Sequence, residues 1–157
     1  PTVQGMLDDG NRYRGFLYAG LMIDSSGAPK VIEFNCRFGD PETQPIMMRL
    51  ESDLAEHCLA ACEGRLANET AIWSDEATIG VVLDSEHYPS SSPTGLPITG
   101  LTASNPSSKV FHDGTRQEGD DTVTAGGRVL CVTAKGELLF CQKVFHREGE
   151  LCSSPSA

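Results

Sequence analysis

The chain has 157 residues, which is enough for an ordinary domain with its own core. Hydrophobic residues make up 39% of it and charged residues 22%, a balance typical of globular rather than disordered proteins. The net charge of -10 argues against non-specific nucleic-acid binding, which needs a basic surface. No apolar run approaches the roughly 20 residues that span a bilayer, so we expect no membrane partner.

The first residues predict a hairpin followed by a helix. Residues 13–23 and 30–35 are rich in aromatic and branched side chains, flank the turn-forming cluster 24–29, and predict two antiparallel strands. Ser52 is the expected N-cap of a helix that carries an apolar stripe and ends near Gly64.

The pattern becomes mainly β in the second half. A strand is predicted over 77–83, then a long loop over 86–106, then short strands at 109–112, 122–124 and 128–133. These elements together predict an α+β fold. We expect a helix-bearing domain, a linker, a small β-rich domain and an irregular tail, over residues 1–64, 65–76, 77–136 and 137–157.

The two ends of the chain carry further expectations. Because the first residue is proline rather than methionine, we expect the chain to be cut from something longer. Residues 137–146 fit a helix or a strand, and 151–157 are expected to be frayed. A changed reading frame or a truncation near residue 136 is one hypothesis for this tail.

Six cysteines lie at positions 36, 58, 62, 131, 141 and 152. They form no CxxC pair, so their spacing does not predict a zinc site. We expect reduced, mostly buried thiols in a cytoplasmic protein.

The second predicted strand carries a polar face. Side chains alternate along a strand, so Glu33, Asn35 and Arg37 share one face if the strand runs that far, and Val31 has the same parity. A carboxylate and an amide oxygen suit a hard cation such as Mg²⁺, and an arginine beyond them suits a phosphate. The same pattern also fits an ordinary solvated sheet face, so the residues alone leave both interpretations open.

A longer stretch carries a family resemblance. The run KVIEFNCRFGDPETQ over 30–44, with GFLYAGLMI over 15–23, resembles the signature of phosphoribosylamine–glycine ligases, which are ATP-grasp enzymes. The resemblance continues through 52–54 and, more weakly, over 80–82, 110–115 and 126–134. It implies part of an ATP-grasp lobe, an antiparallel hairpin plus helix, followed by a small β-rich C-terminal domain.

The resemblance also implies a reaction and its residues. Such enzymes use ATP to convert glycine to glycyl phosphate and join it to 5-phosphoribosylamine, giving glycinamide ribonucleotide for purine biosynthesis. Glu33 and Asn35 match ligands of Mg²⁺ or Mn²⁺, and Arg37 matches a catalytic residue at the reacting phosphoryl or carboxylate group. Asp40 and Glu42 lie in the matching substrate and phosphate loop.

Other interpretations stay open at this point. Many ATP-grasp proteins place an acidic ligand on the first strand of the hairpin, where this chain has Leu21, Met22 and Ile23. These residues either fill the core, which we favour, or line an apolar wall against adenine, with Ile23 as the contact. Another ATP-grasp carboxylate–amine ligase and a non-catalytic binding domain are the competing functions. As a fragment of the glycine ligase, the chain alone is expected to be inactive, because the N-terminal part of the enzyme is missing.

Overall fold

A computed structural model of the chain describes residues 1–101 and 106–137. The predictions for the tail beyond residue 137 lie outside the described residues. The chain divides into two compact units, one made of residues 1–40 with 50–72 and the other of residues 41–49 with those from 73 onward. Residues 41–49 therefore group with the β-rich part of the chain. The predicted domains were continuous stretches of sequence, and their bounds stay a prediction.

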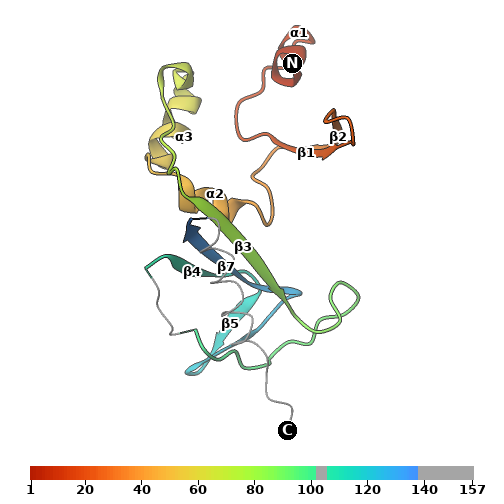
Figure 1. The fold of residues 1–157 in the computed structure, drawn as a ribbon, viewed down its shortest axis with the longest axis vertical. Coiled ribbons are helices and arrows are strands. Elements are labelled where there is room, and N and C mark those ends of the chain that lie inside the picture. The colour runs from red at the N-terminus through yellow and green to blue at the C-terminus, as the bar shows by residue number, and fades with distance from the viewer. Residues whose placement is uncertain (102–105, 138–157) are drawn as a thin grey trace. The chain divides into compact units, whose positions relative to one another are not determined.

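The first unit contains the predicted hairpin and the predicted helix, together with two short helical segments, α1 and η1, that the sequence did not predict (Figure 1). Its elements are α1 (Thr2–Asp8), β1 (Tyr18–Ile23), β2 (Pro29–Asn35), α3 (Leu54–Glu63) and the 3-10 helix η1 (Leu66–Asn68). The prediction that the first strand begins at residue 13 is wrong. Gly15 adopts φ 136, outside the strand region, and the Tyr13 hydroxyl donates to the Phe16 carbonyl oxygen at 2.5 Å.

A β-bulge sets the register of the hairpin. Gly20 pairs with Glu33 and Leu21 pairs with Val31, so Ile32 is the extra residue of β2. Paired residues share a face of the sheet, and neighbours along β1 lie on opposite faces. Val31 therefore lies on the face opposite Glu33, which corrects the parity predicted from the sequence. The apolar hairpin face, as we call it below, consists of Leu21, Ile23, Val31 and Phe34.

Helix α3 begins and ends at side chains suited to those places. Asp53, rather than the predicted Ser52, is the N-cap, and its carboxylate accepts from the backbone N–H groups of Ala55 and Glu56. The Ser52 hydroxyl instead lies 2.7 Å from His57 Nε2 and accepts from the Ile72 N–H at 3.1 Å. Gly64 ends the helix at φ 78, as predicted.

Among its described residues, the second unit contains a short helix, α2, and two antiparallel sheets (Figure 1). A three-stranded sheet has the order β3-β7-β4, and β5 and β6 form a second, two-stranded sheet. The bounds are α2 (Thr43–Arg49), β3 (Ala77–Asp84), β4 (Ser108–His112), β5 (Thr115–Glu118), β6 (Asp121–Thr124) and β7 (Arg128–Gly136). The sequence did not predict β5, because its residues TRQE are polar and have low strand propensity as a group.

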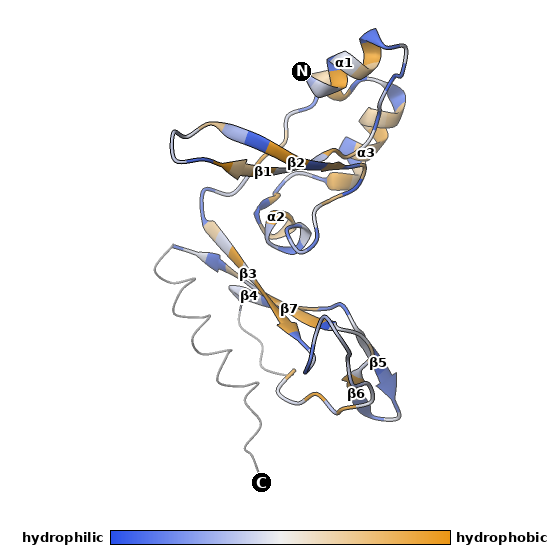
Figure 2. Ribbon diagram, turned by 90° about the vertical axis from the view of Figure 1, so that its right-hand side faces the viewer, coloured by the Kyte–Doolittle hydropathy of each residue, from blue (hydrophilic) through white to orange (hydrophobic). Residues whose placement is uncertain are grey.

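The core of the second unit lies on β7. This central strand has a neighbour on each side, and Figure 2 shows apolar residues along β3 and β7 but polar ones on β5. Leu130 is 3% exposed, and Cys131 and Thr133 are fully buried. The buried Thr133 hydroxyl has a hydrogen-bond partner, since it donates to the Lys109 carbonyl oxygen at 3.1 Å.

Candidate functional site

The hairpin places the two predicted metal ligands on one face. Glu33 pairs with Gly20, and Asn35 pairs with Tyr18, two residues earlier on β1. Both positions follow the bulge, so their two-residue spacing is regular and their side chains project from the same side of the sheet. Gly20 leaves room for the glutamate, because a Cβ there would lie only 3.1 Å from Glu33 Cγ.

The environments of these two side chains differ. Glu33 is exposed, while Asn35 is half-buried and its amide nitrogen is buried without a hydrogen-bond partner. Such an atom carries a desolvation cost that a ligand can remove. Rotating the Asn35 amide group by half a turn about its Cβ–Cγ bond would exchange the positions of its nitrogen and oxygen. The oxygen could then bind a cation. One carboxylate and one amide oxygen fit a hard divalent ion that completes its shell with phosphate and water oxygens.

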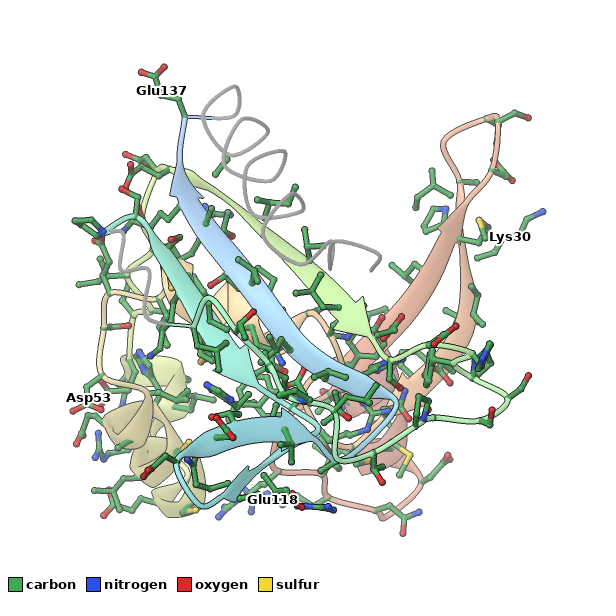
Figure 3. All side chains as sticks on the ribbon, turned by 90° about the horizontal axis from the view of Figure 1, so that it is seen from below. Lys30, Asp53, Glu118 and Glu137 are labelled. Carbon is green, nitrogen blue, oxygen red and sulfur yellow. The ribbon has the colours of Figure 1, made fainter. Side chains whose placement is uncertain are left out.

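Larger clusters of metal-ligating side chains are absent from the described part of the chain. Within residues 1–101 and 106–137, no group of three or more His, Cys, Asp or Glu side chains is arranged to hold a metal ion. At the turn of the hairpin, Asp24 is engaged with Lys30, whose Nζ lies 3.5 Å from the Asp24 Oδ2 atom. Figure 3 labels Lys30 at this end of the hairpin. The Ser26 hydroxyl, followed by the N–H groups of Ala28 and Ser26, holds the pKa of Asp24 below its usual value of 3.8.

Arg37 lies beyond the strand. Because β2 ends at Asn35, the sheet register does not place Arg37 on the face of Glu33, as the sequence predicted for a longer strand. Its side chain is exposed, and Nη1 donates to the Phe38 carbonyl oxygen at 2.8 Å. Phe38 stacks on Phe16 with ring centroids 3.8 Å apart, which holds the chain after β2 against the segment before β1.

The two acidic residues of the predicted phosphate loop belong to different units. Asp40 is exposed and ends the first stretch of the first unit. Glu42 is half-buried and comes directly before α2 in the second unit, where its carbonyl oxygen accepts from the Ile46 N–H at 3.2 Å.

The end of the first strand, β1, is not core. Leu21, Met22 and Ile23 are 48%, 59% and 57% exposed, so the favoured interpretation that they fill the core is wrong. The physical reason is that a two-stranded hairpin buries little surface by itself. The role of Ile23 at an adenine ring stays a prediction.

The thiols are also less buried than predicted. Cys36 and Cys62 are exposed, Cys58 is half-buried and, among the four described cysteines, Cys131 is the buried one. Cys36 comes just after β2, and its hydrogen bond with Tyr13 raises the pKa of that phenol above 10.0.

A cavity in the first unit was not predicted. Its volume is about 420 Å³, and mainly apolar groups of residues 14–16 and α3 line it, including Phe16, Cys58 and Cys62. The spacing of four residues between the two cysteines was the available sequence signal that they share one face of a helix.

The described part of the chain contains no helix long and apolar enough to cross a bilayer.

Comparison with known proteins decides the family. Residues 1–43 match the profile of the phosphoribosylglycinamide synthetase ATP-grasp (A) domain, and residues 78–140 match that of the C domain of the same synthetase. The chain belongs to the phosphoribosylglycinamide synthetase family. The resemblance found in the sequence is thereby confirmed.

Relatives of the family agree with this assignment. Phosphoribosylamine–glycine ligase of Escherichia coli O157:H7 is 60% identical over 138 residues, covering 87% of this chain and 32% of the relative. The ligase of Vibrio cholerae serotype O1 is 61% identical over 137 residues, with the same coverage. The chain therefore spans about a third of the length of these curated relatives.

A solved structure of the family confirms the predicted fold class. The crystal structure of phosphoribosylamine–glycine ligase from Thermotoga maritima matches with a TM-score of 0.77 at 29% sequence identity. The match covers 94% of this chain and 36% of the other. An ATP-grasp piece followed by a β-rich C domain is thus the architecture of the chain, and ATP and a divalent metal ion are expected for the family.

Proposed function

We propose that the chain contributes the metal-binding hairpin and the C domain to an ATP-dependent ligase that joins glycine to 5-phosphoribosylamine. The observation that carries the proposal is the Glu33–Asn35 pair on one face of β2, with an unsatisfied amide, inside the segment matched by the ATP-grasp profile. The product is glycinamide ribonucleotide, an intermediate of purine biosynthesis. We also propose a cytoplasmic location, which suits the free thiols at Cys36, Cys58 and Cys62.

The reaction has two balanced steps. A carboxylate oxygen of glycine attacks the γ-phosphorus of ATP, and the bond to the bridging oxygen breaks, releasing ADP and leaving glycyl phosphate. The amine nitrogen of 5-phosphoribosylamine then attacks the carbonyl carbon, and the carbon–oxygen bond to phosphate breaks, releasing phosphate and a proton. Phosphoryl transfer of this kind depends mainly on positioning and on neutralising charge, so no covalent enzyme intermediate is needed.

The roles of the residues follow from their chemistry. Glu33 and Asn35 would hold Mg²⁺ or Mn²⁺, which when bound neutralises phosphate charge and fixes the geometry of ATP. Arg37 would turn its planar guanidinium from the Phe38 carbonyl to the reacting phosphoryl or carboxylate oxygens. Asp40 and Glu42 would belong to the substrate and phosphate loop. Ile23 lies on the apolar hairpin face, opposite Glu33 and Asn35, so we do not place it at the metal-bound phosphates.

The rest of such a ligase is the proposed partner of this chain. The relatives are about three times longer, and the apolar hairpin face is 44–57% exposed at Leu21, Ile23, Val31 and Phe34. A contiguous exposed apolar face marks an interaction site. We propose that the N-terminal part of the enzyme packs on this face and supplies the groups that cover ATP and bind the phosphoribosyl substrate. The chain alone would then be inactive.

A chimera tests the proposal. This chain replaces the matching third of the Escherichia coli relative, and ADP release is measured with glycine and 5-phosphoribosylamine present or omitted. We expect release that depends on both substrates, and a loss of roughly 100-fold or more when Glu33→Gln removes a charged ligand. Glu86→Gln is the matched control, because Glu86 lies in the second unit and its side chain is 73% exposed.

Three outcomes would count against the proposal. Release of ADP without glycine would remove the substrate assignment, and release with a different amino acid in place of glycine would favour another ATP-grasp carboxylate–amine ligase. Equal activity of Glu33→Gln and Glu86→Gln would remove the metal site.

A further inference from the structure

Strand β3 contacts the first turn of α2 at two residues. The Thr78 hydroxyl donates to the Pro45 carbonyl oxygen at 3.0 Å. Two residues along, a Cβ on Gly80 would lie 3.1 Å from Pro45 Cδ and 3.2 Å from Cγ. Thr78 and Gly80 share a face of β3, so one hydrogen bond and one close approach hold the same proline.

The remainder of α2 is anchored to the same unit. At its end, Arg49 Nη2 donates to the Ser74 carbonyl oxygen at 2.9 Å, and the Ser74 N–H returns a hydrogen bond to the Arg49 carbonyl at 2.8 Å. At its start, Gln44 Nε2 donates to Asp113 Oδ1 at 3.3 Å. Helix α2 is therefore fixed at both ends, and Glu42 comes directly before it.

We infer that Thr78 and Gly80 are positioning residues for the ligase reaction, because they set where the first turn of α2 and the preceding Glu42 lie. The inference rests on the proposed function, which places Glu42 in the substrate and phosphate loop. Neither Thr78 nor Gly80 touches a substrate in this account. A displacement of about 1 Å in a positioning element is enough to cost on the order of 100-fold in rate. The β-rich C domain thus acts on catalysis through α2.

Paired substitutions in the chimera test the hydrogen bond. Thr78→Val removes the donor at constant shape and should lower kcat by roughly 10- to 100-fold, with a smaller change in the KM for ATP. Thr78→Ser keeps the hydroxyl and should restore most of the activity. Thr122→Val is the control, because the Thr122 hydroxyl bonds to Gln117 at 3.3 Å, within the β5–β6 hairpin. An unchanged kcat for Thr78→Val, or an equal loss for Thr78→Ser, would overturn the inference.

A second pair tests the close approach. Gly80→Ala should lower kcat, and adding Pro45→Ala should recover it, because the Cγ and Cδ atoms in the way are removed. A double variant as impaired as Gly80→Ala alone would contradict positioning through Pro45.

A readout without catalysis separates this inference from the proposed function. In the chain alone, amide hydrogen exchange over residues 46–49 should be faster in Thr78→Val and normal in Thr78→Ser and Thr122→Val. If the parent chimera releases no ADP, the proposed function fails. The exchange result then decides whether β3 positions α2, and unchanged exchange in Thr78→Val overturns that statement.

Discussion

The β1–β2 hairpin and strand β7 have similar apolar side chains but opposite environments. Leu130 on β7 is 3% exposed, whereas Leu21 on β1 is 48% exposed. The difference arises because β7 has a strand on each side and packs against α2, while the hairpin consists of two strands. Strand composition therefore predicts the strand, and the neighbours decide its burial.

This contrast bears on function. The segment matched by the C-domain profile contains its own core around Leu130 and Cys131. The segment matched by the ATP-grasp profile carries Glu33 and Asn35 on a hairpin with an exposed apolar face. The proposed metal ligands therefore lie on a hairpin with an exposed apolar face, in contrast to the buried core around β7.

The largest expected effect comes from truncating the same residue type in both regions. Leu130→Ala should destabilise the second unit by about 2–5 kcal/mol, because it leaves a cavity in a packed strand. Leu21→Ala, the matched control, should change stability by less than about 0.5 kcal/mol. Hydrogen exchange of the β7 and β1 amides reads the two units separately. Similar losses for the two variants would contradict the contrast.

Two glycines, one in each unit, allow the packing of the two units to be compared. A Cβ on Gly114 would lie 2.4 Å from the Arg128 carbonyl oxygen, so Gly114→Ala must displace backbone and should cost about 1–3 kcal/mol. Gly5 in α1 has nothing within 4 Å of such a Cβ, and Gly5→Ala should be neutral or stabilising by up to about 1 kcal/mol. Chemical denaturation of the two variants checks the difference. A Gly114→Ala chain as stable as Gly5→Ala would show that the second unit is loosely packed.

Local contacts should matter more in the first unit. Asp53, labelled in Figure 3, is the N-cap of α3. Asp53→Ala removes this cap and should lower the free energy of unfolding by roughly 1 kcal/mol. Asp53→Asn keeps an acceptor oxygen, so its loss of stability should be only a few tenths of the loss caused by Asp53→Ala. Exchange of the α3 amides distinguishes them, and equal protection in both variants would argue that packing rather than capping holds the helix.

The smallest effect concerns the hairpin turn. Because the folded pKa of Asp24 lies below 3.8, its carboxylate stabilises the turn above about that pH, and the contribution is lost as the pH falls through the folded value. Ser26→Ala removes the leading cause and should raise the Asp24 pKa toward 3.8 in a carbon-detected NMR titration. Ser25→Ala is the control, and an equal shift in both would assign the effect to the turn as a whole.

The sequence predicted local features better than long-range ones. The hairpin, the glycine end of α3 and the strands that became β3 and β7 follow from local pattern. The bulge at Ile32 has no such signal, since Val, Ile and Phe suit a regular strand equally well. The grouping of residues 41–49 with β3 was equally hidden, because it depends on Pro45 meeting Thr78 and Gly80 across more than thirty residues.

The candidate site shows the same limit. Alternation predicted that Glu33 and Asn35 share a face, and the register places them so. The position of Arg37 depended on where β2 ends, which propensity does not fix to one residue. The exposure of Ile23 depended on neighbours that local sequence does not specify.

The most direct test follows an oxygen atom through the proposed reaction. The chimera is supplied with ATP, 5-phosphoribosylamine and glycine whose carboxylate carries ¹⁸O, and the released phosphate is analysed by mass spectrometry. If glycine attacks the γ-phosphorus and glycyl phosphate is then cleaved at its carbon–oxygen bond, each phosphate should carry one ¹⁸O atom from glycine. Phosphate that contains no ¹⁸O, despite ADP release, would contradict the account.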